Sequence, residues 1–295
     1  MAWQDTLIQL YLYICHHYQG HLWVLAQRLS NNDQPTLTDE EVLTIYLFGI
    51  VRKHRTIQDI YHYTKDHLAA WFPALPCYGG YVQRLNRLHE VFPGLVEQVL
   101  EDFAPEGVLE AVRLVDSFPV VMAREKRSSR ARVAPELANK GYCASKKMYF
   151  YGVKVHLLAL RRPGTLPVPD YIGLSPGADN DLTVLRSILP RLRDCEVYGD
   201  KIYADAELVE RLAREQNVRL YTPIKKKKGQ KELALTDRVY SKIVSGVRQP
   251  VESLFNWLEE KTGIEVASKV RSYKGLMVHV FGRLAAAMFM LAFNP

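Results

Sequence analysis

The spacing of apolar residues changes a little more than a third of the way along the chain. Before that point apolar side chains recur every three or four residues, as in Val82, Leu85 and Leu88, which is the period of an amphipathic helix. After it, short runs rich in β-branched and aromatic residues alternate with helical stretches. The pattern predicts an all-α N-terminal domain over residues 1–107 and an α/β domain over residues 108–295.

The N-terminal domain is predicted to consist of short helices. Thr38 and Glu41 have the spacing of a capping box ahead of an apolar helix. A further helix is predicted over residues 57–71, before a segment that contains two prolines. Short helices with tight breaks are compatible with a helix-turn-helix-like unit that recognises DNA ends. The acidic balance of this segment favours a structural or dimerising role instead, and both interpretations stay open.

The second domain is predicted to contain a mixed sheet of five strands flanked by helices. One helix is expected over residues 181–193, between the third and fourth strands, and one over residues 206–216, between the fourth and fifth strands. Another helix carries Glu252. Three strands followed by alternating helices and strands is an α/β order. The predicted strands are residues 108–122, 148–160, 168–175, 195–199 and 218–222.

Composition is that of a globular protein, with 48% hydrophobic and 24% charged residues in a chain of 295. The four cysteines are widely separated and contain no CxxC pair, which predicts neither a zinc site nor a disulfide framework. The N-terminus lacks the pattern of a secretory signal. The most apolar stretch, residues 275–291, includes His279 and Arg283 and is shorter than a bilayer span. We therefore expect a core helix there, no membrane partner, and a cytoplasmic protein.

Charge is distributed unevenly between the two parts of the chain. The net charge is +7, but residues 1–110 hold 7 Lys/Arg against 13 Asp/Glu, a balance of −6. The remaining residues therefore carry +13. A strongly cationic second part suits a polyanion such as DNA or RNA, and a solubilising surface is the alternative.

Three acidic residues occupy distinctive positions. Asp116 lies within an apolar strand, Asp200 ends a strand, and Glu252 lies near the start of a helix. Buried carboxylates that converge repel one another unless divalent cations compensate their charge. Functional sites in α/β sheets gather where strands end. If the first and fourth predicted strands are neighbours, the two aspartates lie side by side. An Asp, an Asp and a Glu around two Mg²⁺ ions can cut and join phosphodiesters.

A structural role is open for each of these acids. Asp116 can bond to backbone, Asp200 can serve a turn after a glycine, and Glu252 can interact with the helix dipole. Asp205 directly precedes a predicted helix and Asp181 begins one, so both are expected to be N-caps.

Two clusters of basic residues are candidates for binding DNA phosphates. The first follows the Asp116 strand directly, which would place it beside the acids; the second follows the fifth strand. Arg248 either orients Glu252 or holds a phosphate. A solvated loop is the alternative for each cluster and an exposed surface position for Arg248. The first cluster contains Arg124, Lys126, Arg127, Arg130 and Arg132, and the second contains Lys225, Lys226, Lys227, Lys228 and Lys231.

Three sequence blocks resemble the signatures of DDE transposases from bacterial insertion sequences. They are Val115-Asp116-Ser117, residues 198–203 around Asp200, and Arg248-x-x-x-Glu252. The resemblance covers the whole chain and points to the insertion sequence nine-eighty-two family. Its further blocks are residues 136–142, 146–147, 151–156 and 263–271.

The resemblance implies an RNase H-like fold and two Mg²⁺ ions held by Asp116, Asp200 and Glu252, with Mn²⁺ able to substitute. It also implies hydrolysis of phosphodiesters at insertion-sequence ends and transfer of the freed 3′-hydroxyl into target DNA. The partners would be double-stranded DNA and further copies of the chain, as a homodimer or higher oligomer associated with the nucleoid in the bacterial cytoplasm. Another RNase H-like nuclease and an inactive DNA-binding relative stay open as alternatives.

The sequence departs from a related pattern in two places. Some of these enzymes carry a tyrosine before the arginine and a lysine seven residues after the glutamate; here Ser245 and Glu259 occupy those positions. The DNA contact of that lysine is therefore not expected from Glu259. Only 51 residues separate Asp200 from Glu252, which excludes a large inserted domain between them.

Overall fold

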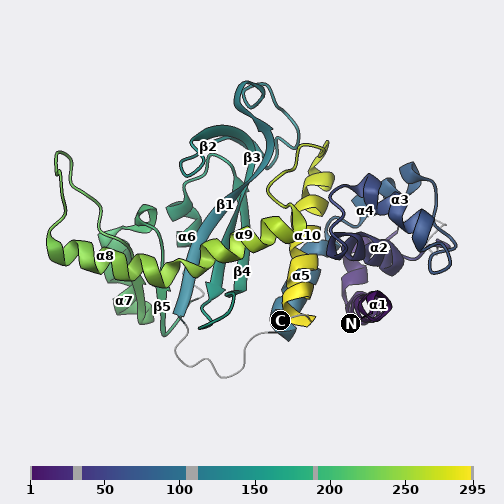
Figure 1. Cartoon of the computed structure of the whole chain (residues 1–295), viewed down its shortest axis with the longest axis horizontal. Helices are drawn as coiled ribbons and strands as arrows, with labels where there is room; N and C mark the ends of the chain where they lie inside the picture. The colour runs from purple at the N-terminus through teal and green to yellow at the C-terminus, as the bar shows by residue number, and fades with distance from the viewer. Residues whose placement is uncertain (1, 29–34, 104–111, 189–191, 294–295) are drawn as a thin grey trace. The chain divides into compact units, whose positions relative to one another are not determined.

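The chain folds as two units that a single cut in the sequence does not separate. The computed structural model describes residues 2–28, 35–103, 112–188 and 192–293 (Figure 1). Contacts within the chain group residues 1–104 with 258–295 into a helical unit, and residues 105–257 into a unit built on a β-sheet. The predicted boundary at residues 107 and 108 lies outside the described residues.

The helical unit is organised around two helices that are buried on almost every side, α2 (Asp39–Val51) and α10 (Tyr273–Phe293). In α2 every residue from Val42 to Ile50 is buried. A helix that is apolar all round belongs inside a core. The other described elements of this unit are α1 (Trp3–Gly20), η1 (Leu22–Ala26), α3 (Ile57–His67), α4 (Tyr78–Arg87), α5 (Val91–Asp102) and the end of α9 (Pro250–Thr262).

The predicted capping box at the start of α2 is confirmed. The Thr38 hydroxyl accepts a hydrogen bond from the Glu41 N–H at 3.2 Å, and the Glu41 carboxylate accepts one from the Thr38 N–H at 2.6 Å. Two of the N–H groups that a helix start leaves without partners are satisfied in this way.

Helix α10 is the core helix predicted over residues 275–291, and it packs against α2, α4 and α5. This packing is why the contacts assign residues 258–295 to the helical unit, whereas the sequence grouped them with the sheet. Within the described residues α10 alone is long and apolar enough to cross a bilayer, but much of it is buried in the fold. Core helices of soluble proteins meet the same criterion, so α10 does not indicate a membrane protein.

The polar residues of α10 are satisfied inside this core. The buried Arg283 guanidinium donates hydrogen bonds to the carbonyls of Thr262 and Arg55 and to Nδ1 of His279. Nε2 of His279 lies 2.9 Å from the Ile264 carbonyl. Burial and the neighbouring Arg283 lower the pKa of His279 to about 3, which keeps the imidazole neutral. Arg283 therefore binds the last carbonyl of α9 and holds α10 to the end of that helix.

The sheet unit contains the mixed sheet that the sequence predicted, with one additional strand. In the described part of the chain the order is β2-β3-β1-β5-β6, and β4 also pairs with β3. Strand β3 is antiparallel to β1, β2 and β4, whereas β1, β5 and β6 are parallel. The six strands are β1 (Val112–Arg124), β2 (Asn139–Cys143), β3 (Met148–Leu160), β4 (Val168–Pro176), β5 (Cys195–Tyr198) and β6 (Val218–Tyr221).

The prediction of five strands was wrong because β2 was missed. Strand β2 pairs with the first residues of β3, from Met148 to Gly152, and β4 pairs with the rest of the same edge from Val153. The five residues of β2 have no apolar alternation of their own, so only their partner identifies them as a strand. The sheet is therefore five positions wide, with β2 and β4 sharing one edge.

The other predicted elements of this unit are confirmed where the structure describes them. Helix α6 (Asp181–Ile188) begins at the predicted residue. Residues 189–191 of that prediction lie outside the described residues, and its last two residues, Leu192 and Arg193, are not helical. Residues 108–111 of the first predicted strand also lie outside the described residues. Helix α7 spans Ala206–Gln216, as predicted. Helix α8 (Leu235–Arg248) was not predicted.

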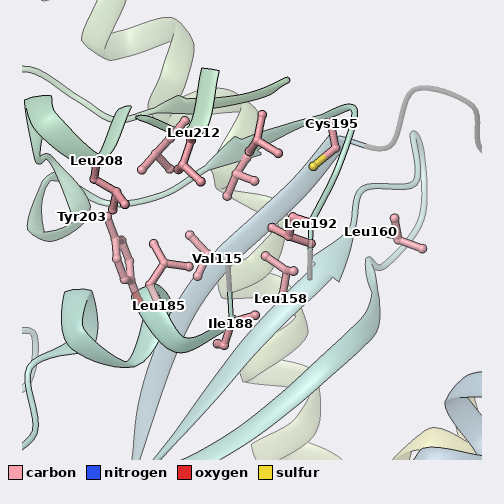
Figure 2. Close-up of a cluster of buried hydrophobic side chains, with 13 residues drawn as sticks. Val115, Leu158, Leu160, Leu185, Ile188, Leu192, Cys195, Tyr203, Leu208 and Leu212 are labelled. Atoms are coloured by element: carbon pink, nitrogen blue, oxygen red, sulfur yellow. The ribbon is translucent and has the colours of Figure 1, made fainter. Parts of the chain in front are cut away.

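Different helices cover the two faces of the sheet. On one face Val115 and Leu158 belong to a buried cluster with α6 and α7 (Figure 2). Side chains alternate along a strand, so Asp116 and Phe118 lie on the opposite face. There the Phe118 ring contacts Phe255 of α9, with ring centroids 4.9 Å apart. Asp116 is thereby placed on the face that carries α9.

We predict that Gly282→Ala destabilises the helical unit. A Cβ at Gly282 would lie 2.5 Å from the Tyr46 ring, and overpacking of this kind costs about 1–3 kcal/mol. Urea denaturation measures the change in the free energy of unfolding. Gly79→Ala is the matched control, because nothing lies within 4 Å of a Cβ at that helical position; it should leave stability unchanged or raise it by up to about 1 kcal/mol. Equal stability of the two variants would contradict the packing of α10 on α2.

Candidate active site

The first and fourth predicted strands are neighbours, as the sequence required for its two aspartates to lie side by side. Strands β1 and β5 are parallel, with Val112 opposite Glu196 and Leu114 opposite Tyr198. Continued for two residues, this register brings Asp116 level with Asp200. Asp200 lies two residues after the end of β5 and caps the short helix η4 (Lys201–Tyr203), accepting a hydrogen bond from the Lys201 N–H at 2.7 Å.

A guanidinium group joins Asp116 to Glu252. Arg248 ends α8, and Glu252 lies in the first turn of α9. Nη1 of Arg248 donates to Oδ2 of Asp116 at 2.5 Å, and Nη2 donates to Oε1 of Glu252 at 2.7 Å. The side chains of Arg248 and Asp116 are 14% and 21% exposed, whereas Glu252 is 52% exposed. Arg248 thus orients Glu252, which is one of the two roles that the sequence left open.

Asp116 lies among other carboxylates. Burial raises the pKa of Asp116 to about 6, while Arg248 and a 2.8 Å hydrogen bond from the Ser117 N–H act in the opposite direction. The carboxylates of Asp200 and Asp181 add to the increase. Like charges affect a pKa in this way only at short range. The fold therefore collects negative charge around Asp116.

Asp181 is not the N-cap that the sequence predicted. The cap of α6 is Asn180, whose side-chain oxygen accepts a hydrogen bond from the Leu182 N–H at 2.9 Å. The Asp181 carboxylate instead pairs with Lys154 of β3 at 2.9 Å, and both side chains are at most 15% exposed. Sequence reasoning missed this residue, although Asn180-Asp181 places two residues able to cap in succession and only one can occupy the cap.

The prediction for Asp205 is confirmed. Its carboxylate accepts a hydrogen bond from the Leu208 N–H at 3.0 Å, so it is the N-cap of α7. Asp205 is therefore a structural residue that lies close in sequence to the candidate site.

The chemistry of these residues fits a divalent cation such as Mg²⁺ or Mn²⁺. Carboxylate oxygens are the ligands that these ions prefer, and Asp116 within β1 lies level with Asp200, just beyond the end of the neighbouring strand β5. Among the described residues no three His, Cys, Asp or Glu side chains are already gathered as a metal site. The guanidinium of Arg248 supplies the positive charge that Asp116 and Glu252 share.

The first basic cluster does not lie beside the acids. Strand β1 continues as far as Arg124, eight residues beyond Asp116, which corresponds to roughly 25 Å at the usual rise per residue. The expected position was wrong because Asp116 lies well inside the strand, so the loop that follows the strand is far from it. Arg124, Lys126, Arg127 and Arg130 are all exposed.

The second basic cluster approaches the Asp200 turn. Nζ of Lys225 donates to the carbonyl of Ala204 at 3.4 Å, four residues after Asp200. Lys226 donates to the carbonyl of Lys231 at 2.8 Å, which closes the exposed lysine-rich loop. The hydrogen bond of Lys225 thus connects the second basic cluster to the segment that follows Asp200.

We predict that Asp116→Asn stabilises the metal-free protein at neutral and alkaline pH. Because burial raises the pKa of Asp116 to about 6, the folded protein holds this proton more tightly than the unfolded chain does, and stability is lost as pH rises from about 4 through 6. An amide carries no charge, so the variant avoids this loss. Urea denaturation in EDTA should show a gain on the order of 1–3 kcal/mol at pH 8 that vanishes near pH 4. Asp205→Asn should show no such gain, and a gain equal at both pH values would refute the assignment.

Comparison with known protein families bears on this geometry. A family model described as the transposase DDE domain matches residues 106–272, more than half of the chain. No curated protein and no solved structure matches the chain. The matched stretch spans the positions of Asp116, Asp200 and Glu252. Because it covers more than half of the chain, the chain belongs to the DDE transposase family.

Proposed function

We propose that the chain is a DNA transposase that hydrolyses phosphodiesters at insertion-sequence ends and transfers the freed 3′-hydroxyl into target DNA. Membership of the family implies a function in transposition and DNA as the partner. The observation that carries the proposal is the parallel pairing of β1 with β5, which brings Asp116 level with Asp200 inside the matched region. Glu252 is tied to Asp116 through Arg248.

In this proposal Asp116, Asp200 and Glu252 hold two Mg²⁺ ions, for which Mn²⁺ can substitute. When bound, the ions activate a water or a 3′-hydroxyl as the nucleophile and stabilise the leaving oxygen. Arg248 has to release Asp116, Glu252 or both for their oxygens to become ligands. The freed guanidinium then remains beside the acids, where it can bind a DNA phosphate with two hydrogen bonds. Arg248 therefore serves both roles that the sequence allowed, in succession.

The wider assignment follows the same resemblance. The order of the sheet, with an antiparallel half and a parallel half that meet at β1, supports an RNase H-like fold. We further propose that the chain belongs to the insertion sequence nine-eighty-two family, acts as a homodimer or higher oligomer, and works at the nucleoid of a bacterial cytoplasm. For the N-terminal helical domain we propose a structural or dimerising role, since its net charge opposes DNA binding.

The two basic clusters would contact different parts of the DNA. A separation of roughly 25 Å from Asp116 corresponds to about seven base pairs of B-form DNA. Arg124, Lys126, Arg127 and Arg130 would thus bind phosphates that flank the reacting one. Lys225 and Lys226, near the Asp200 turn, would bind phosphates close to it.

We expect Asp116→Asn and Asp200→Asn each to lower the rate of DNA cleavage by at least about 10³-fold, which corresponds to roughly 4 kcal/mol of transition-state stabilisation. The measurement is cleavage and joining of duplex DNA that carries the termini flanking the coding sequence, with Mg²⁺. Asp205→Asn is the matched control, because asparagine serves equally as an N-cap, and it should remain active.

The products of this assay separate the alternatives. Ends joined to target DNA support the transposase, whereas cleavage without joining indicates another nuclease. Binding of DNA without any reaction indicates an inactive relative. Wild-type rates in the Asp116 or Asp200 variant would remove that residue from the site.

We also predict that replacing Lys126 and Arg127 by alanine weakens DNA binding and flattens its dependence on salt. Each lost phosphate contact reduces the slope of log K against log salt by about 0.9, so the double variant should lose about 2 units of slope. Replacing Arg211 and Arg214, exposed on α7, removes the same charge from another surface and is the control. An identical slope in the wild type and the Lys126/Arg127 variant would exclude this loop from the DNA interface.

A further inference from the structure

Two tyrosines at one end of the sheet leave about half of their surface in water. Tyr142 of β2 and Tyr149 of β3 lie directly opposite each other and are 49% and 56% exposed. Their ring centroids are 5.0 Å apart. Their neighbours Cys143 and Phe150 lie on the other face of the two strands and are buried there. A cross-strand aromatic pair stabilises a hairpin, and the exposed parts of both rings are accessible to a partner.

The tyrosine pair lies on the face of the sheet that carries Asp116. Asp116 is opposite Leu157 of β3, and Tyr149 lies eight residues from Leu157 along the same strand. Side chains alternate between the two faces, so an even separation keeps both residues on one face. The residues of β3 between them, from Phe150 to His156, are buried or nearly so. This face therefore emerges from the core at the tyrosine pair, roughly 25 Å from Asp116 at the usual rise per residue.

The first basic cluster lies at the same end of the sheet. Its first residue, Arg124, is opposite Phe150 of β3. The chain then returns over the face of the tyrosine pair, because the Tyr151 hydroxyl donates a hydrogen bond to the Val133 carbonyl at 3.1 Å. Val133 follows directly on Arg132, the last residue of the cluster. The basic loop therefore begins and ends beside the strand residues that adjoin the tyrosines.

Positive charge surrounds the two rings. Nζ of Lys140 lies 4.9 Å from the centroid of the Tyr149 ring, a cation–π contact. Lys146 and Lys147 are exposed in the turn that joins β2 to β3. Residues 124–149 contain 8 Lys/Arg against 2 Asp/Glu, a balance of +6. A second copy of this surface would be repelled by it, whereas a polyanion would be attracted.

We propose that Tyr142 and Tyr149 bind unpaired bases of DNA by stacking, while the lysines and arginines around them bind the phosphates of the same strand. This inference rests on the proposed function, which makes DNA the partner. Exposed aromatic rings within a positively charged surface are the combination that binds single strands of any sequence. Inside a duplex a base presents only its edges to a protein, so stacking on these rings requires bases that have left their pairs. The position of the rings places such bases about seven nucleotides from the reacting phosphate.

The test is titration of the full chain, without divalent metal, with labelled oligothymidylate and with a mixed-sequence duplex that has the same number of phosphates. The double variant Tyr142→Val/Tyr149→Val removes both rings and keeps residues that favour a strand. It should bind oligothymidylate about 100-fold more weakly, tenfold for each ring, and bind the duplex as the wild type does. The salt dependence should not change, because no charge is removed. Phenylalanine at both positions keeps the rings and should preserve binding.

Tyr78→Ala is the matched control. Tyr78 in the helical unit is 41% exposed, and its ring lies 5.4 Å from that of Tyr61, so it is another half-exposed tyrosine in an aromatic pair. It lies in the acidic part of the chain, and its loss should leave the affinity for both DNA probes unchanged.

The outcomes separate this inference from the proposed function. If the wild type binds neither probe, the proposed function fails and the inference fails with it. If the wild type binds DNA and the double valine variant binds oligothymidylate as tightly, the inference fails and the proposed function stands. Equal weakening for both probes would assign the rings to backbone contacts and overturn base stacking. Unchanged DNA affinity with a smaller oligomer in sedimentation would assign them to an interface between copies, which also overturns it. Should the double variant not fold, Tyr142→Val alone decides: unchanged affinity for oligothymidylate overturns the proposal.

Discussion

The parallel pairing of β1 with β5 is the constraint on which the acidic centre depends. It sets Asp116 level with Asp200 although 83 residues lie between them in the sequence. Parallel strands require a long crossover, and here that crossover contains β2, β3, β4 and α6. A shift of one residue in this register would turn Asp116 to the opposite face, away from Arg248. The position of the acids is thus a property of the sheet as a whole.

Carboxylates that converge need positive charge, and in this fold side chains supply it. Arg248 bonds to Asp116 and Glu252, and Lys154 bonds to Asp181. A divalent cation bound to the same oxygens would compete with the Arg248 guanidinium, so ion binding and release of this arginine are linked. Burial is the main reason why the pKa of Asp116 is raised despite its salt bridge, and the repulsion from Asp200 and Asp181 adds to it. Without an ion, the buried charge of Asp116 therefore destabilises the fold at neutral pH.

Much of the fold is decided by local patterns, so it could be read before any coordinates. The long strand at residues 148–160 and the helix at residues 206–216 appear within the predicted bounds, because alternation and helical periodicity are properties of neighbouring residues. The Thr38 capping box and the Asp205 N-cap were predicted for the same reason. The choice of Asp116, Asp200 and Glu252 as candidates likewise came from their local settings and a family resemblance.

Tertiary structure decided everything that depends on a distant partner. Strand β2 exists because the edge of β3 offers it hydrogen bonds, and α10 belongs to the helical unit because α2, α4 and α5 bury it. Arg248 meets Asp116 across 132 positions, and no local pattern encodes that pairing. The pairing of Asp181 with Lys154 is hidden for the same reason, since capping is what the neighbours of Asp181 in sequence indicate. Periodicity specifies the elements, whereas charge pairing and burial between elements specify the site.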